Sequence, residues 1–225
     1  MCFHLLNLFG IPLIDGRVLR WIVVHKNMHL RNFIINVLAF TGGFSIMSLE
    51  LLGGRILAPY FGSSIYVWGS IITVFMLSLS VGYLIGGRIS IHNPTLFRFG
   101  TIFLLGSITL YPLIIIAQPL MQKTFESIVD PRYGSLIASL ILFVVPTVIL
   151  GAISPYAVRL LVTDVTRSGK VAGTLYFIST MGSAIGTLAT SFYLILWMSV
   201  NSIVTLLCLM LAISGLFAMW VGKRA

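Results

Sequence analysis

Hydrophobic residues run along this chain in long stretches that are separated by short polar segments. Six stretches are long enough for a transmembrane helix, because a bilayer core of about 30 Å needs roughly 20 apolar residues. We place the predicted spans at residues 33–52, 65–87, 97–120, 136–158, 172–197 and 201–221. Pro112 and Pro146 lie inside spans three and four, where a proline predicts a kink. The short turn at 198–201 predicts that the last two spans pack as an antiparallel pair.

This pattern predicts an all-α integral membrane protein built as a six-helix transmembrane bundle. Six spans can divide into two sets of three, and an odd count inverts the second set. A weak trace of such a repeat is the tripeptide Ala58-Pro59-Tyr60 after span one and Ser154-Pro155-Tyr156 at the end of span four. The turn Gly86-Gly87-Arg88 resembles the loop between spans two and three of major facilitator transporters, without its acidic partner. We therefore weigh a 3+3 inverted repeat that resembles half of such a transporter.

The composition supports a membrane protein and excludes a soluble globular enzyme as the main interpretation. The chain has 225 residues, of which 58% are hydrophobic and only 8% charged, against about a quarter charged in soluble domains. Only five acids are present, and Cys2 and Cys208 lie at opposite ends of the chain. We find no metal-ligand spacing, no phosphate-binding glycine loop and no nucleophile beside a base. We therefore expect no catalytic residue, metal or cofactor in this chain.

Basic residues are distributed unevenly between the two sides of the predicted spans. With the N-terminus in the cytoplasm, the opposite side holds only Arg55, Lys123 and Arg132. The cytoplasmic side then holds Arg17, Arg20, Lys26, Arg31, Arg88, Arg98, Arg159, Arg167, Lys170, Lys223 and Arg224. Because short cytoplasmic loops carry the excess of Lys and Arg, we expect both termini in the cytoplasm and a multi-pass protein of the cell inner (plasma) membrane. The net charge of +9 points to anionic lipids rather than nucleic acid.

The chain divides into three predicted regions. Residues 1–31 form an N-terminal cytoplasmic or interfacial segment. The alternative is that translation starts at Met28 and that the residues before it are not part of the protein. Residues 32–222 form the six-span membrane domain, and residues 223–225 form a cytoplasmic tail.

Glu50 is the acid that we place inside or at the edge of a span. A carboxylate in hydrocarbon costs a few kcal/mol, so it should face the bundle interior and have a partner. Arg55 lies five residues on, and a bend at Gly53 and Gly54 would allow the two to meet. Glu50 and Arg55 are then either a proton or cation site or a structural pair that fixes the end of span one.

Two glycine pairs are candidates for helix packing. Gly82 and Gly86 lie in span two, and Gly182 and Gly186 lie in span five. Small residues let helix backbones approach closely in lipid. The pairs therefore predict packing within the chain, with a dimer interface as the alternative.

The longest cytoplasmic loop carries Arg159, Asp164, Arg167 and Lys170. We interpret these residues either as a solvated positive loop or as a docking surface for a soluble partner.

Two blocks, residues 49–90 and 146–195, resemble the membrane half of the membrane-integrated spermidine synthase-like family, whose members fuse a transporter-like part to a spermidine synthase part. The matching residues of the first block are Glu50, Arg55, Ala58, Pro59, Phe61 and Gly62. The matching residues of the second are Ser154, Pro155, Gly169, Val171, Ala172, Gly173, Ser179, Thr180, Gly182, Ser183, Gly186 and Thr187.

The resemblance implies a function shared with a soluble domain. Family members continue into a Rossmann-like aminopropyltransferase or methyltransferase-like domain, whereas this chain ends at Ala225. We therefore expect that this chain alone is not an enzyme and that it anchors a separately encoded spermidine synthase-like or methyltransferase-like protein. The alternative is a small transporter of a cationic or polyamine-like solute that works as a homodimer, with Glu50 as its coupling site.

Overall fold

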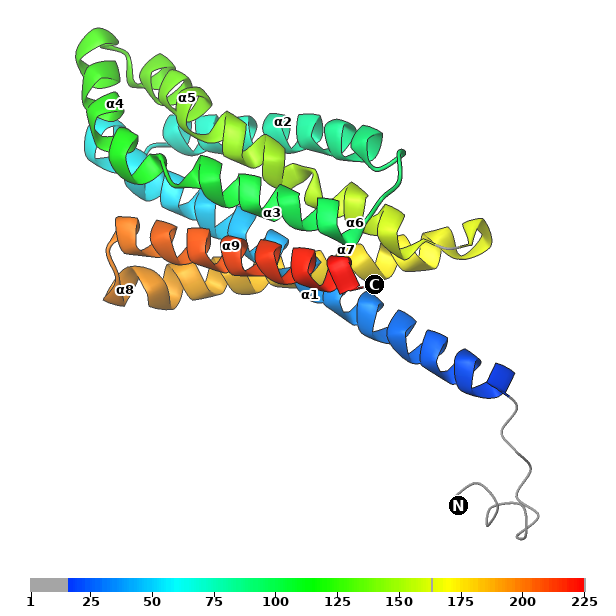
Figure 1. Ribbon diagram of the computed structural model, residues 1–225. Helices are drawn as coiled ribbons and strands as arrows, with labels where there is room; N and C mark the ends of the chain where they lie inside the picture. The colour runs from blue at the N-terminus through cyan, green and yellow to red at the C-terminus, as the bar shows by residue number, and fades with distance from the viewer. Residues whose placement is uncertain (1–15, 163, 225) are drawn as a thin grey trace, which may run out of the picture. The chain divides into compact units, whose positions relative to one another are not determined.

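The computed structural model describes residues 16–162 and 164–224, and every regular element within them is a helix (Figure 1). Five helical segments are long and apolar enough to cross a membrane: Leu30–Phe61, Ile65–Ile89, Pro131–Leu161, Ser168–Trp197 and Val200–Arg224. A sixth span results if the bent pair Leu96–Leu110 and Leu113–Ser127 counts as one. The chain is therefore all-helical, with five to six candidate membrane spans.

The elements follow one another with short connections. In chain order they are α1 (Gly16–Phe61), α2 (Ile65–Ile89), α3 (Leu96–Leu110), α4 (Leu113–Ser127), α5 (Pro131–Gly151), α6 (Ile153–Leu161), the 3-10 helix η2 (Val165–Arg167), α7 (Ser168–Ala189), the π-helix η3 (Thr190–Leu194), α8 (Ile195–Trp197) and α9 (Val200–Arg224). The chain divides within α1 into two compact units, residues 1–34 and residues 35–225. The predicted N-terminal segment 1–31 is described only from Gly16, where α1 begins.

Local sequence signals fix several helix ends. Asp130 caps α5 by accepting the backbone N–H of Arg132 at 2.9 Å, with Pro131 at the first helical position, where a missing N–H costs nothing. The hydroxyl of Thr95 caps α3 by accepting the N–H of Arg98 at 3.2 Å. Gly62 follows the end of α1 with φ of 77°, a conformation that glycine adopts without strain.

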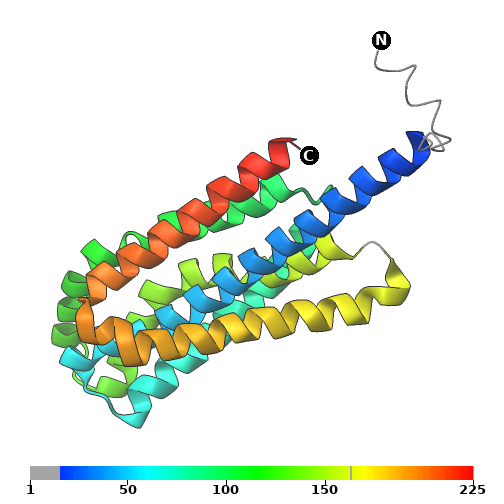
Figure 2. The same cartoon turned by 90° about the horizontal axis from the view of Figure 1, so that it is seen from below.

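Two helix pairs make extensive contacts within the second unit. α2 packs on α5, and α3 packs on α9 (Figure 1, Figure 2). In the α3–α9 pair, Gly100 and Gly215 face each other, and a Cβ on Gly215 would lie 2.8 Å from the Gly100 carbonyl oxygen. Aromatic side chains fill the core, including Phe75 against Phe143 with ring centroids 5.4 Å apart.

The structure departs from the predicted spans in several places. The third span bends by 44° between α3 and α4, at Pro112 as predicted. The fourth span has Pro146 inside α5, and its helix is interrupted at Ala152. α9 pairs mainly with α3 rather than with the preceding span, so the predicted pair of the last two spans is wrong. α9 also continues to Arg224, which places the described part of the predicted tail in a helix.

Candidate functional site

The expected contact between Glu50 and Arg55 is not formed. α1 continues through Gly53 and Gly54 to Phe61 as one unbroken helix. An uninterrupted helix turns residues five apart by about 140° relative to each other, so the two side chains project from different faces. Arg55 is exposed. Among the described residues, no ion pair or hydrogen bond joins Glu50 to any other side chain.

Glu50 lies inside the candidate span Leu30–Phe61 rather than at its edge. Its side chain is half-buried, whereas the neighbouring Leu49 and Leu52 are fully buried. We expected the Glu50 carboxylate to face the interior of the bundle. The structure places it at the margin of the bundle instead.

The small residues of α7 form a close interface with α1. A Cβ on Gly182 would clash with the carbonyl oxygen of Phe40, and a Cβ on Gly186 would lie 2.5 Å from that of Phe44. On the α1 side, a Cβ on Gly43 would clash with the carbonyl oxygen of Ser179. The two helices therefore meet backbone to backbone, which only glycine permits at these positions.

Two buried hydroxyl groups form hydrogen bonds across this interface, at the end where α7 passes into η3. Thr190 donates a hydrogen bond to the Ser48 hydroxyl at 2.9 Å, and Ser48 donates to the Gly186 carbonyl oxygen at 3.3 Å. Thr190 also begins the π-helix η3, and such local widening is frequent at functional sites. Sequence reasoning did not predict this contact, although a hydroxyl inside each of two apolar spans is the signal that could have suggested it.

The glycines of span two make the same kind of close contact with the segment that contains α5 and α6. A Cβ on Gly82 would clash with the Val148 carbonyl oxygen, and a Cβ on Gly86 would lie 2.6 Å from the Ala152 carbonyl oxygen. The structure therefore brings all four predicted packing glycines against another helix of the same chain.

The predicted docking loop is only partly a loop. Arg159 lies in α6 and Lys170 lies in the first turn of α7, while Asp164 and Arg167 lie in the connecting segment. The exposed Asp164 accepts hydrogen bonds from the Thr166 hydroxyl at 2.8 Å and the Thr166 N–H at 3.0 Å. These two hydrogen bonds lower the pKa of Asp164, and the bond from the Thr166 hydroxyl has the larger effect.

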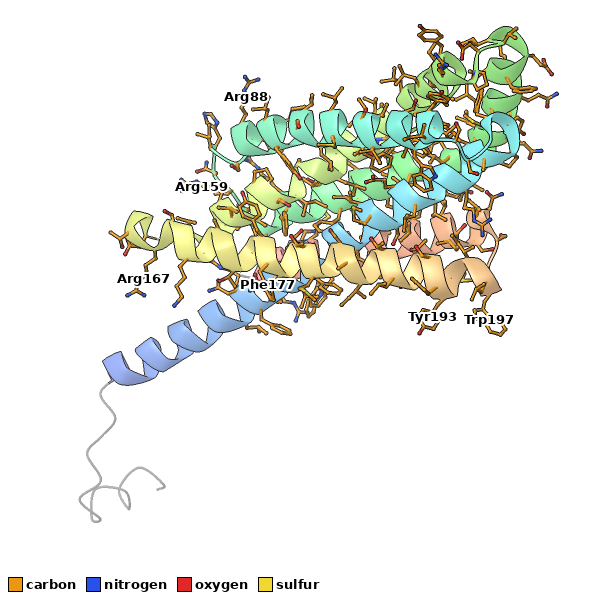
Figure 3. All side chains as sticks on the ribbon, turned by 180° about the vertical axis from the view of Figure 1, so that it is seen from behind. Arg88, Arg159, Arg167, Phe177, Tyr193 and Trp197 are labelled. Atoms are coloured by element: carbon orange, nitrogen blue, oxygen red, sulfur yellow. The ribbon has the colours of Figure 1, made fainter. Side chains whose placement is uncertain are left out.

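Arginines and aromatic residues gather at opposite ends of the second unit. Figure 3 shows Arg88, Arg159 and Arg167 at one end and Tyr193 and Trp197 at the other, and all five are exposed. We call the first the basic end. No carboxylate forms an ion pair with these arginines within the described part of the chain. Tyr and Trp are typical of membrane–water interfaces, so their positions near the end of a predicted span are a signal that the sequence already carried.

No family model, curated protein or solved structure that we compared with this chain matches it. The resemblance to spermidine synthase-like proteins therefore comes from the two sequence blocks alone. No group of three His, Cys, Asp or Glu side chains that could hold a metal ion occurs in the described residues.

Proposed function

We propose that this protein is a multi-pass anchor of the inner membrane that holds a separately encoded transferase-like protein at the cytoplasmic face. The observation that carries the proposal is the basic end, where exposed cations lack acidic partners among the described residues. The partner would present an acidic surface to Arg88, Arg159, Arg167 and Lys170. The resemblance to spermidine synthase-like proteins supplies the class of that partner.

The orientation is tested by labelling single cysteines. In a background with Cys2→Ser and Cys208→Ala, we expect an impermeant maleimide to label Arg167→Cys only in inverted vesicles and Ser199→Cys only in right-side-out vesicles. Labelling of both cysteines in the same type of vesicle would contradict the proposed orientation.

The partner is tested by photo-crosslinking from a benzoyl-phenylalanine at residue 167 in native membranes. We expect a crosslink to a soluble transferase-like protein. The crosslink should be lost in the Arg159→Glu, Arg167→Glu double variant, and salt should weaken it because exposed charges are screened. Lys123→Glu, outside the basic end, is the matched control. Crosslinks to lipid alone would contradict the anchor.

We propose as a second candidate a small transporter of a cationic or polyamine-like solute that works as a homodimer. It is favoured by Glu50, a carboxylate inside a candidate span without a partner in the described residues, since such residues commonly mark ion or substrate paths. Uptake of labelled putrescine into proteoliposomes should fall for Glu50→Gln and persist for Glu126→Gln, an exposed acid of α4. Equal uptake by both variants would remove Glu50 from the mechanism.

A further inference from the structure

We propose that Glu50 binds the cationic head of an amphiphilic monocation that reaches it sideways from the bilayer, between α2 and α7. This inference rests on the Glu50 site of the second candidate function, but it concerns binding and does not require transport.

The position of Glu50 follows from the two glycines that share its face of α1. Gly43 lies seven residues before Glu50 and Gly54 four residues after it, spacings that keep all three on one side of a helix. A Cβ on Gly43 would meet Ser179 of α7, and a Cβ on Gly54 would lie 2.6 Å from the Trp68 ring of α2. This face of α1 therefore passes from α7 to α2, and Glu50 lies between the two contacts.

α2 and α7 flank this face of α1 without closing over Glu50, whose side chain keeps part of its surface exposed. α2 packs on α5 and α6, and the span that contains α7 is only 17% buried, the lowest value of the five. Figure 3 shows the ribbon of α1 passing between α2 and α7 toward the Trp197 end. The partly exposed side chain of Glu50 therefore reaches the outer surface of the bundle, within the candidate span Leu30–Phe61.

The charges around Glu50 favour a ligand with one positive charge. Neither α2 nor α7 contains an acid, and their basic residues, Arg88 and Lys170, lie toward the basic end. One unpaired carboxylate matches one positive charge, whereas a diamine would leave its second charge in hydrocarbon, where no partner offsets the loss of water.

The walls beside Glu50 select an apolar body for this ligand. Trp68 is followed along α2 by Ile72 and Met76, which are 43% and 64% exposed. A cation that carries aromatic or alkyl groups would cover these apolar side chains while its charge meets the carboxylate.

The test measures equilibrium binding of tritiated tetraphenylphosphonium to the full chain in nanodiscs, with protein-free nanodiscs as the background. We expect saturable binding that dodecyltrimethylammonium displaces and equimolar putrescine does not. Glu50→Gln should weaken binding by at least about tenfold, Glu50→Asp should retain part of it, and Glu126→Gln should bind as the unchanged protein does. Ile72→Trp, a substitution at an exposed position that narrows the lateral approach, should weaken binding even if Glu50→Gln fails to fold.

Three results would overturn the inference: binding no greater than to protein-free nanodiscs, equal binding by folded Glu50→Gln, and displacement by putrescine at equal concentration. The last would mean that the carboxylate opens to water rather than to lipid. Putrescine uptake that persists without tetraphenylphosphonium binding would refute the inference and leave the transporter intact, whereas binding without uptake would do the reverse.

Discussion

Gly186 offers the sharpest test of the α1–α7 interface. In Gly186→Ala, the new Cβ would lie 2.5 Å from the Phe44 carbonyl oxygen and 2.9 Å from the Phe44 Cα, against the 3.4 Å at which ordinary contact begins. The helices would have to separate by several tenths of an ångström. The bond from Ser48 to the Gly186 carbonyl oxygen is already 3.3 Å long, so this separation would also break it.

The magnitude is best measured against Gly173→Ala on the same helix, since a Cβ there meets nothing within 4 Å. Both substitutions gain about 1 kcal/mol of helix propensity, which cancels in the comparison. Overpacking costs about 1–3 kcal/mol, and an interhelical hydrogen bond in a membrane protein contributes about 0.6 kcal/mol. We therefore expect Gly186→Ala to be about 2–3 kcal/mol less stable than Gly173→Ala.

The assay is reversible unfolding of the purified protein by SDS in mixed micelles, followed by tryptophan fluorescence. Equal free energies of unfolding for the two variants would refute the close backbone contact between α1 and α7. A loss of dimer with unchanged monomer stability would refute it too, because Gly186 would then face a second copy of the chain.

Three further predictions follow from single contacts. Thr190→Val keeps the shape of the side chain but removes its hydrogen bond to α1, and it should lower the free energy of unfolding by about 0.6–1.7 kcal/mol; no change in the SDS titration would contradict this. Tyr156→Phe removes the hydroxyl that accepts from the Thr95 N–H at 3.2 Å and should cost about 1 kcal/mol, with faster hydrogen exchange at the Thr95 amide as the readout. The hydrogen bonds that lower the pKa of Asp164 imply a turn that is stable at neutral pH and is lost as the pH falls through that lowered pKa. Thr166→Val should raise the pKa of Asp164 toward its ordinary value in a carboxyl-carbon NMR titration, and an unchanged pKa would exclude this cause.

Much of the helical architecture could be predicted from the sequence, because the length of an apolar stretch is a local property. Five predicted spans coincide with single candidate spans, and Pro112 marks the bend of the remaining one. The predictions failed where a local rule was extended to a break or a contact. The glycines after Glu50 left α1 as one unbroken helix, because glycine permits a bend but does not require one. The helix of span four breaks at Ala152, a position that the sequence did not single out.

The candidate site was predicted less completely than the helices. The sequence identified Glu50 and the four packing glycines as residues of interest, since an acid or a glycine pair in an apolar span stands out. It did not reveal that Glu50 would be without a partner in the described residues, nor that Ser48 and Thr190 would meet across two helices that are far apart in the chain.

The sequence by itself determined which segments are apolar enough to cross a membrane and where the basic residues lie along the chain, because both depend only on neighbouring residues. The tertiary structure decided that α9 pairs with α3 and that α7 meets α1. Lipid solvates every apolar face equally well, so hydrophobicity does not select the partner of a helix in a membrane. The choice depends on whether small residues and hydroxyls on two distant segments match in shape and position, which becomes visible only when the helices are assembled.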